Sequence, residues 1–159
     1  MKKVVLIIPI YNEAEVIEKT ITQVFSACDN ALADRLHILI FDSHSTDGTA
    51  EIIKRLQQQY PQLYLQQEAE KSGLGGAYMK AMDYAINTMN ADIVIEYDAD
   101  GSHQPRYIQP MCEAVDAGAD VVLGSRYVTG GSIPDNWGFH RKCLSVVRNW
   151  IARLFLSPK

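Results

Sequence analysis

The feature that most constrains the fold is the alternation of short apolar runs with longer stretches of helical periodicity. The runs are too short for helices and predict strands over residues 3–9, 36–41, 63–67, 93–97 and 120–124. Strands joined by helices require crossover connections, which build a mainly parallel, twisted sheet with helices on both faces. The sequence therefore predicts an α/β protein with a Rossmann-like, three-layer α/β/α architecture.

The intervals between these runs carry helix boundary signals. Asn12 is placed to cap a first helix, and a helix is predicted within residues 73–89. Pro105 is suited to the first turn of another helix, for which Gly118 provides the C-cap. A last helix is predicted over residues 142–156.

Composition favours one globular domain over residues 1–159, since 47% of the residues are hydrophobic. The three cysteines are widely spaced, which indicates neither a disulfide framework nor a zinc cluster and favours a reducing cytoplasm. We expect no secretory signal and no membrane span, because no uncharged apolar stretch approaches the roughly 20 residues that a bilayer requires.

Charge divides the chain at residue 125. Residues 1–125 carry 9 Lys and Arg against 18 Asp and Glu, whereas residues 126–159 carry 6 against 1. The basic end is a candidate acceptor-binding or membrane-facing segment, and its predicted helix over 142–156 is basic and amphipathic. Solubility, and packing of that helix against the sheet, are the alternatives.

Two carboxylates follow the strand predicted over 93–97. In open α/β sheets ligands gather where strands end, so Asp98 and Asp100 lie where a ligand would bind. Their mutual repulsion favours a bound cation, and hard oxygen ligands suit Mg²⁺ or Mn²⁺, which would in turn hold a diphosphate. The alternative is a polar turn in which Asp100 caps the next helix. His103 could add a metal ligand or bond the backbone of its loop.

Polar residues also follow the first two predicted strands. Pro9 ends the first strand, and Tyr11 and Glu13 suit a nucleobase and a ribose. Asp42 and Ser43 end the second strand in the same geometry and could reach the same ligand. Ordinary strand-to-helix turns are the alternative in both places.

Two further segments are candidates for anion binding. Glycines between Lys71 and Ala77 precede a helix but match neither a P-loop nor a dinucleotide fingerprint, so they indicate a close approach to a nucleotide with Lys71 near phosphate, or a tight turn. Arg126, Arg141 and Ser145 could form a phosphate site, since guanidinium groups bind phosphate in a bidentate manner.

Five motifs occur together in an order typical of one family: Pro9-x-Tyr11-Asn12-Glu13, Asp42 to Thr49, Lys71-x-Gly73-Leu74-Gly75-x-Ala77-Tyr78, Asp98-Ala99-Asp100-x-Ser102-His103-x-Pro105, and Gly124-Ser125-Arg126-Tyr127-x-x-Gly130-Gly131. The chain resembles inverting family 2 glycosyltransferases of the dolichyl- or polyprenyl-phosphate mannosyltransferase type. The resemblance implies a GT-A fold that binds a nucleotide sugar, a GDP- or UDP-hexose, and transfers the sugar to a polyprenyl phosphate. It implies a protein peripheral to the cytoplasmic membrane face, with no nucleic-acid partner.

The resemblance also implies roles for individual residues. The nucleotide-sugar site would comprise Pro9, Tyr11, Glu13, Phe41, Asp42, Ser43, Lys71, Asp98, Ala99, Asp100 and Arg126. Asp98 and Asp100 would bind the metal, Asp100 and Arg126 would be catalytic, and Arg126, Arg141 and Ser145 would bind the acceptor phosphate.

Two departures from the family stand out. Ser43 occupies a position where the family usually has a second aspartate, and the family continues for roughly half a domain beyond residue 159. We therefore expect a chain that lacks the C-terminal part. Transfer to a saccharide hydroxyl, and a nucleotide-binding module without turnover, remain the alternatives. Whether a membrane partner subunit or a second copy completes the chain stays open.

Overall fold

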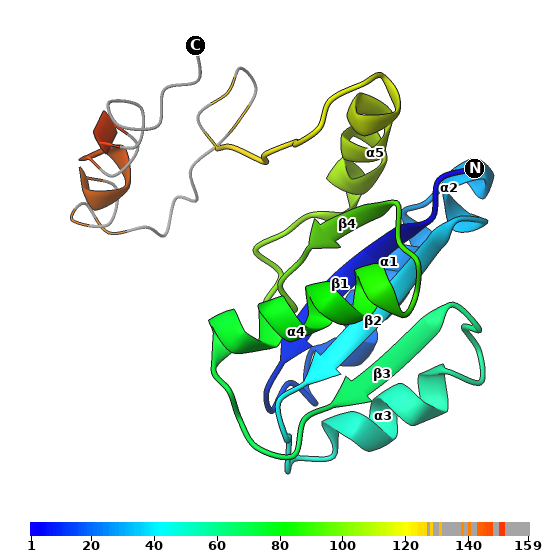
Figure 1. The fold of residues 1–159 in the computed structure, drawn as a ribbon. Coiled ribbons are helices and arrows are strands. Elements are labelled where there is room, and N and C mark those ends of the chain that lie inside the picture. The colour runs from blue at the N-terminus through cyan, green and yellow to red at the C-terminus, as the bar shows by residue number, and fades with distance from the viewer. Residues whose placement is uncertain are drawn as a thin grey trace. The chain divides into compact units, whose positions relative to one another are not determined.

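The computed structural model describes residues 1–126, 128, 131, 138, 140, 143–147, 150 and 151 of the chain. Residues Met1–Val122 form one compact unit, and Leu123–Lys159 belong to a second one. The sheet and its helices all belong to the first unit (Figure 1).

The first unit is built on four parallel strands. They are β1 (Val4–Ile10), β2 (Leu36–Asp42), β3 (Leu63–Gln67) and β4 (Ile93–Glu96). Their order in the sheet is β3-β2-β1-β4, and every neighbouring pair is parallel. The four strands lie within about one residue of the positions predicted from the apolar runs, so the α/β prediction is confirmed.

Helices cover both faces of this sheet (Figure 1). They are α1 (Ile17–Ser26), α2 (Asn30–Ala33), α3 (Thr49–Leu56), α4 (Leu74–Asn87) and α5 (Ile108–Asp116), the last preceded by the 3₁₀ turn η1 (Pro105–Tyr107). Pro105 opens the turn η1 that leads into α5, and Gly118, with a φ of 107°, directly follows the C-cap residue Ala117, so the predicted start and end signals are confirmed.

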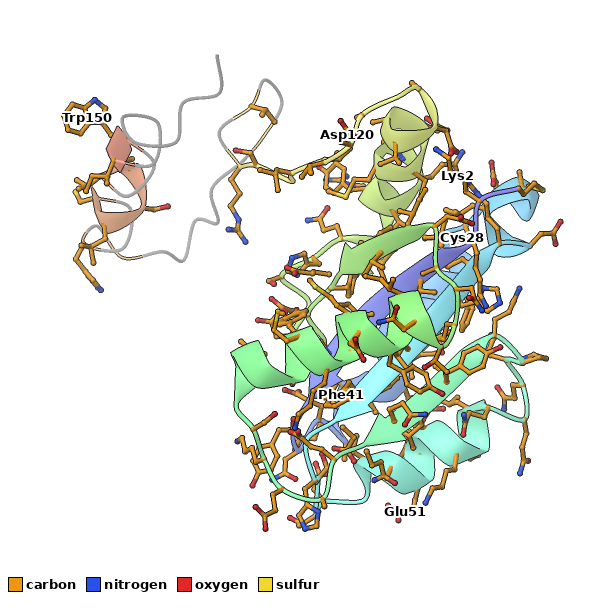
Figure 2. The ribbon with its side chains drawn as sticks, in the orientation of Figure 1. Lys2, Cys28, Phe41, Glu51, Asp120 and Trp150 are labelled. Carbon is orange, nitrogen blue, oxygen red and sulfur yellow. The ribbon has the colours of Figure 1, made fainter. Side chains whose placement is uncertain are left out.

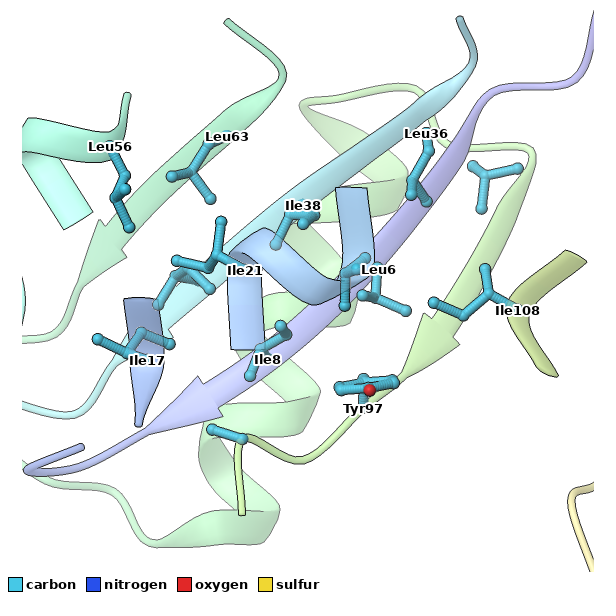
Figure 3. Close-up of a cluster of buried hydrophobic side chains, with 14 of the residues drawn as sticks. Leu6, Ile8, Ile17, Ile21, Leu36, Ile38, Leu56, Leu63, Tyr97 and Ile108 are labelled. Atoms are coloured by element: carbon cyan, nitrogen blue, oxygen red, sulfur yellow. The ribbon is translucent and has the colours of Figure 1, made fainter. Parts of the chain in front are cut away.

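Alternation along β1 divides the core into two layers. Leu6 and Ile8 pack in one cluster with Ile17 and Ile21 of α1, as Figure 3 shows. The intervening Ile7 packs in the other cluster, beneath α4. Because successive side chains of a strand point to opposite faces, a fully apolar strand such as β1 requires a helix layer on each side.

The layer beneath α4 is thin because its helix residues are small. Ala77, Ala81 and Ala85 are buried against Leu39 and its neighbours on the sheet. Phe41, labelled in Figure 2, belongs to the same cluster. A row of alanines lets the helix backbone approach the sheet closely, which fixes the position of the flanking side chains on α4.

The strand order reverses at β1. The chain proceeds from β1 to β2 and β3 on one side, then returns to place β4 on the other side of β1. In sheets of this kind the crevice outside the carboxyl ends of the strands at the reversal point binds ligands. The segments that leave β1 and β4 begin at Tyr11 and Tyr97 and carry the residues predicted to bind ligand.

Two sequence predictions about regular structure are wrong. The run over residues 120–124 is not a strand, and Val121 and Leu123 are 74% and 83% exposed. An apolar run becomes a strand only when a neighbouring strand receives its backbone hydrogen bonds, and no pairing with this run occurs among the described residues. Asn12 does not cap α1, which begins at Ile17, and instead adopts a φ of 57°.

The second unit is described only in part. Residues 143–147 are helical, as are residues 140, 150 and 151, in agreement with the helix predicted over 142–156. Leu144, Val147 and Ile151 are exposed. Lys142, residues 148–149 and residues 152–156 lie outside the described residues.

Candidate functional site

Three potential metal ligands gather just beyond β4. Asp98, Asp100 and His103 each offer one ligand atom, and these atoms lie within 4.8 Å of one another. Two carboxylates and an imidazole at an open edge of a sheet are a suitable donor set for a divalent cation. The structure therefore brings together the two aspartates and the histidine that the sequence singled out, and the N–H of Asp98 also donates a hydrogen bond of 3.3 Å to Nδ1 of His103.

The backbone of this loop favours the charged form of Asp100. The N–H of Ser102 donates a hydrogen bond of 2.8 Å to Oδ1 of Asp100. This bond is the main cause of a lowered pKa for Asp100, and the nearby His103 adds to it. Asp100 is thus an ionised turn residue, and it does not cap a helix, because η1 follows Gln104 without a side-chain cap.

Two hydroxyl groups donate hydrogen bonds to the backbone of the loop that carries Asp98 and Asp100. Thr20 on α1 donates a hydrogen bond of 3.0 Å to the carbonyl oxygen of Ala99, and both residues are buried. The hydroxyl of Tyr97 donates a bond of 2.8 Å to the carbonyl oxygen of His103. Burial raises the pKa of Tyr97 to about 12, so its hydroxyl remains a donor at neutral pH.

A third hydroxyl contacts one of the acidic side chains directly. Oη of Tyr78 on α4 donates a hydrogen bond of 2.6 Å to Oδ1 of Asp98. Burial raises the pKa of Tyr78, and the Asp98 carboxylate raises it further. The sequence analysis included Tyr78 in a motif but predicted no role for it. Its position shortly after the glycine-rich loop was the one feature of the sequence that pointed to the site.

The carboxyl ends of β1 and β2 form the other side of the site. Pro9 does not end the first strand as predicted: it pairs in register with Phe41, and β1 continues to Ile10. The N–H of Ser43 donates a bond of 2.9 Å to the carbonyl oxygen of Ile10. Tyr11 then leaves the strand, and the residue is 42% exposed. The ammonium group of Lys71 lies 3.3 Å from the centre of that ring, a cation–π contact.

Glu13 connects this side electrostatically to the acidic cluster. The backbone N–H of Glu13 donates a bond of 3.0 Å to the hydroxyl of Thr49. The residue itself is half-buried. Burial raises the pKa of Glu13, and repulsion from Asp100 and Asp47 raises it further. The negative charge of Asp100, which is predicted to bind the metal, thus raises the pKa of Glu13, which is predicted to face the ribose.

Asp42 and Ser43 are both buried. Oδ1 of Asp42 accepts a bond of 3.0 Å from the N–H of Ser45, and Oδ2 accepts one of 2.9 Å from the side-chain amide of Gln67. Both carboxylate oxygens therefore have donors within the chain. These bonds fix the turn that follows β2, whereas the predicted contacts of Asp42 and Ser43 with a nucleoside stay a prediction.

The turns after β1 and β2 are tied to each other. The N–H of Asn12 donates a bond of 2.8 Å to Oγ of Ser45, and Oδ1 of Asn12 accepts one of 2.9 Å from the N–H of Thr46. The left-handed backbone of Asn12 is common for asparagine and turns its side chain toward the second loop. The sequence analysis interpreted Asn12 as a helix cap and did not predict a connection between the two turns.

The predicted phosphate-binding residues of the basic segment belong to the second unit. Arg126 and Ser145 are described within it, and Arg141 lies outside the described residues. Their predicted roles are therefore carried forward as proposals.

Comparison with known proteins identifies relatives along the whole chain. The profile of the family described as Glycosyl transferase family 2 matches residues 5–156. Polyprenol monophosphomannose synthase of Mycolicibacterium smegmatis is 36% identical over 157 residues, which are 98% of this chain and 57% of the relative. Dolichol-phosphate mannosyltransferase of Pyrococcus furiosus is 37% identical over 158 residues, 99% of this chain and 42% of the relative. The chain thus spans about half the length of these curated relatives.

Solved structures show the same fold. A mannosyltransferase from Pyrobaculum calidifontis, in complex with GDP-Man and Mn²⁺, is 32% identical with a TM-score of 0.52 over 62% of this chain and 28% of its own. S. aureus TarS is 20% identical with a TM-score of 0.59 over 72% of this chain and 32% of its own, a likeness of fold. Across the described residues, no helix has both the length and the apolar character needed to cross a membrane.

Proposed function

Because this chain belongs to glycosyl transferase family 2, we propose that it is the donor-binding part of an inverting mannosyltransferase that acts on a polyprenyl phosphate. The observation that carries the proposal is the group of Asp98, Asp100 and His103 beside the turn that holds Glu13. Relatives named as polyprenol and dolichol-phosphate mannosyltransferases support this choice of sugar and acceptor.

The donor in this proposal is GDP-mannose. The related mannosyltransferase from Pyrobaculum calidifontis is in complex with GDP-Man, and its identity of 32% makes it a relevant guide. Tyr11 offers an exposed ring on which a base can stack, with Lys71 beside it, and Glu13 offers a carboxylate to ribose hydroxyls. Lys71 would shift from its contact with Tyr11 to accommodate the base.

Asp98 and Asp100 would hold Mg²⁺ or Mn²⁺ in this proposal, and the arrangement fits such an ion. The ligand atoms are close enough to share one cation, and Asp100 has a lowered pKa. When bound, the cation supplies positive charge that offsets the charge of a leaving nucleoside diphosphate. Asp98 and Asp100 contribute by binding and orienting that group at the edge of the sheet.

The proposed reaction is a direct displacement. An oxygen of the acceptor phosphate forms a bond to the anomeric carbon while the bond from that carbon to the donor diphosphate breaks, and its electron pair leaves with GDP. The acceptor is already anionic at neutral pH, so it requires positioning and no general base. Arg126, Arg141 and Ser145 would position it, because arginine binds phosphate through paired N–H donors.

A lipid acceptor implies contact with a membrane surface. Residues 126–159 carry the excess of basic residues, and the described residues Leu144, Val147 and Ile151 are exposed. Positive charge and exposed apolar side chains together suit a surface that carries anionic lipids. We place the protein at the cytoplasmic face of the membrane as part of this proposal.

Nucleotide binding tests the proposal directly. Wild-type protein and an Asp100→Asn variant are titrated with GDP and with UDP, with and without Mn²⁺, and the melting temperature is followed. GDP with Mn²⁺ should raise the melting temperature of the wild type, since a ligand that binds only the folded state stabilises it. Asp100→Asn should respond less. No response of the wild type to any nucleotide would refute the proposal.

Transfer is tested with GDP-mannose and a short polyprenyl phosphate. Formation of the lipid-linked mannose supports the full proposal. Donor binding without transfer would favour the nucleotide-binding module, and transfer to a saccharide instead of the lipid phosphate would favour a hydroxyl acceptor.

A further inference from the structure

The hydroxyl group of Tyr78 contacts the carboxylate of Asp98 in the acidic cluster. Tyr78 lies on α4 and is half-buried, and its Oη is 2.6 Å from Oδ1 of Asp98. The same Oη is 3.4 Å from the carbonyl oxygen of Tyr97, at the margin of hydrogen bonding. The strong contact of this hydroxyl is therefore with the carboxylate.

The two oxygens of Asp98 face different partners. Oδ1 accepts the bond from Tyr78, whereas Oδ2 lies 3.6 Å from Nδ1 of His103. Asp98, Asp100 and His103 each offer one ligand atom within 4.8 Å of the others. Oδ2 is the oxygen of Asp98 that accepts no bond from Tyr78 and lies nearer to His103.

We propose that Tyr78 is a positioning residue for the cation site, which fixes the rotation of the Asp98 carboxylate so that Oδ2 faces the ion. This inference rests on the proposed function, because it requires that Asp98 and Asp100 bind a divalent cation. Hydrogen bonds to ligating carboxylates orient them and contribute to metal affinity. Because Oδ1 of Asp98 accepts the bond from Tyr78, we expect Oδ2 to be the oxygen that binds the ion.

The position of the hydroxyl is set by packing that does not involve the site. Ala77 and Ala81 are buried against the sheet on either side of Tyr78 in the sequence of α4. The ring of Tyr78 packs against the same cluster. The helix is therefore held independently of Asp98, as a positioning residue requires.

The backbone of the loop is held by other groups. Thr20 bonds the carbonyl oxygen of Ala99, and Tyr97 bonds that of His103. Neither bond depends on the hydroxyl of Tyr78. Removal of that hydroxyl should therefore free the carboxylate of Asp98 to rotate while the loop keeps its path.

The test is a Tyr78→Phe substitution, with Tyr84→Phe as the matched control. Tyr84 is on the same helix and packs against the same apolar cluster, and its hydroxyl makes no hydrogen bond among the residues that the structure describes. Mn²⁺ is titrated into the wild type and both variants, and free aqueous Mn²⁺ is measured by electron paramagnetic resonance. Melting temperatures are recorded in EDTA.

We expect Tyr78→Phe to weaken Mn²⁺ binding by about tenfold or more, the usual range for the loss of an outer hydrogen bond to a metal ligand. Tyr84→Phe should bind Mn²⁺ like the wild type, and both variants should melt near the wild type in EDTA. In an Asp98→Asn background, Tyr78→Phe should cause little further loss, because the two residues act as one unit.

Three results would overturn the inference. Mn²⁺ could bind Tyr78→Phe as tightly as it binds the wild type, or Tyr84→Phe could lose the same affinity, which would assign the effect to helix packing. Tyr78→Phe could also melt far below Tyr84→Phe in EDTA, which would show a structural role. In contrast, a wild type that binds no Mn²⁺ would refute the proposed metal site itself and the inference with it.

Discussion

The backbone N–H of Ala14 donates a hydrogen bond of 3.0 Å to Oδ2 of Asp47. Oδ1 of the same carboxylate accepts a bond of 3.1 Å from the N–H of Thr49, and the Thr49 hydroxyl accepts one from Glu13. Asp47 thus joins the loop after β1 to the start of α3. These hydrogen bonds connect the loop after β1 with the loop after β2 at the proposed nucleoside site.

Asp47→Asn should therefore weaken both folding and nucleotide binding. The bond from the Thr49 hydroxyl is the main cause of a lowered pKa for Asp47, so the carboxylate contributes stability above pH 3.8 that is lost as the pH falls. We expect the variant to melt a few degrees lower at pH 7 and to bind GDP about tenfold more weakly, because Glu13 loses its support. Calorimetry and isothermal titration measure the two effects. Asp34→Asn, an exposed control, should change neither.

Glu13→Gln should stabilise the metal-free protein at neutral pH. Burial, followed by repulsion from Asp100 and Asp47, raises the pKa of Glu13 above 4.5. A raised carboxyl pKa gives stability below pH 4.5 that is lost as the pH rises through the folded value, so the neutral amide removes a cost at pH 7. The variant should melt above the wild type at pH 7 and lose this advantage at pH 4. An equal or lower melting temperature at pH 7 would contradict the burial and repulsion assigned to Glu13.

Glu68→Gln should flatten the acid dependence of stability. Lys80 donates the bond that contributes most to lowering the pKa of Glu68 to about 2, and Ser72 adds two more bonds. The ionised group therefore stabilises the fold above pH 4.5, and this stability is lost as the pH falls toward 2. Chemical denaturation at pH 7 and pH 3 should show a smaller difference for the variant than for the wild type. Glu70→Gln, an exposed control, should keep the wild-type difference.

Ala81→Leu should reduce stability and metal affinity together. Ala81 is fully buried on the face of α4 that packs against the sheet, and added methyl and methylene groups in a packed core cost about 1–3 kcal/mol. The helix would be displaced from the sheet and would carry Tyr78 away from Asp98. Denaturant titration and Mn²⁺ binding measure the two losses. Met79→Leu, at an exposed position of the same helix, should leave both unchanged.

The sheet was predictable because its signals are local. β1, β2 and β4 are largely apolar runs between polar turns, and such a run is a clear signal in a parallel sheet because both faces of a central strand are buried. The position of Asp98 and Asp100 at a strand end was predictable for the same reason. The run over 120–124 has a similar apolar pattern, but a strand also requires a neighbouring strand that receives its backbone hydrogen bonds. The local sequence does not indicate whether such a neighbour is present.

The support of the site was not predictable because it joins distant residues. Tyr78 and Asp98 are 20 positions apart, and Asn12 and Thr46 are 34 positions apart. Sequence propensity favours a helix cap for an asparagine such as Asn12. Its left-handed backbone instead allows its side chain to bond the neighbouring loop, and the local sequence does not indicate this contact. Contacts of this kind follow from the sheet order, which brings strand ends together irrespective of their separation along the chain.

The central place of β1 has a consequence for the order of assembly. β1 is synthesised first, yet it pairs on one side with β4, in the register Val4 to Ile93. About ninety residues must leave the ribosome before that pairing is complete, and pairings between distant segments form slowly. A cation at Asp98 therefore cannot guide early folding of the nascent chain. If the proposed cation binds there, its effect on kinetics should be to slow unfolding, because it binds the folded loop that follows β4.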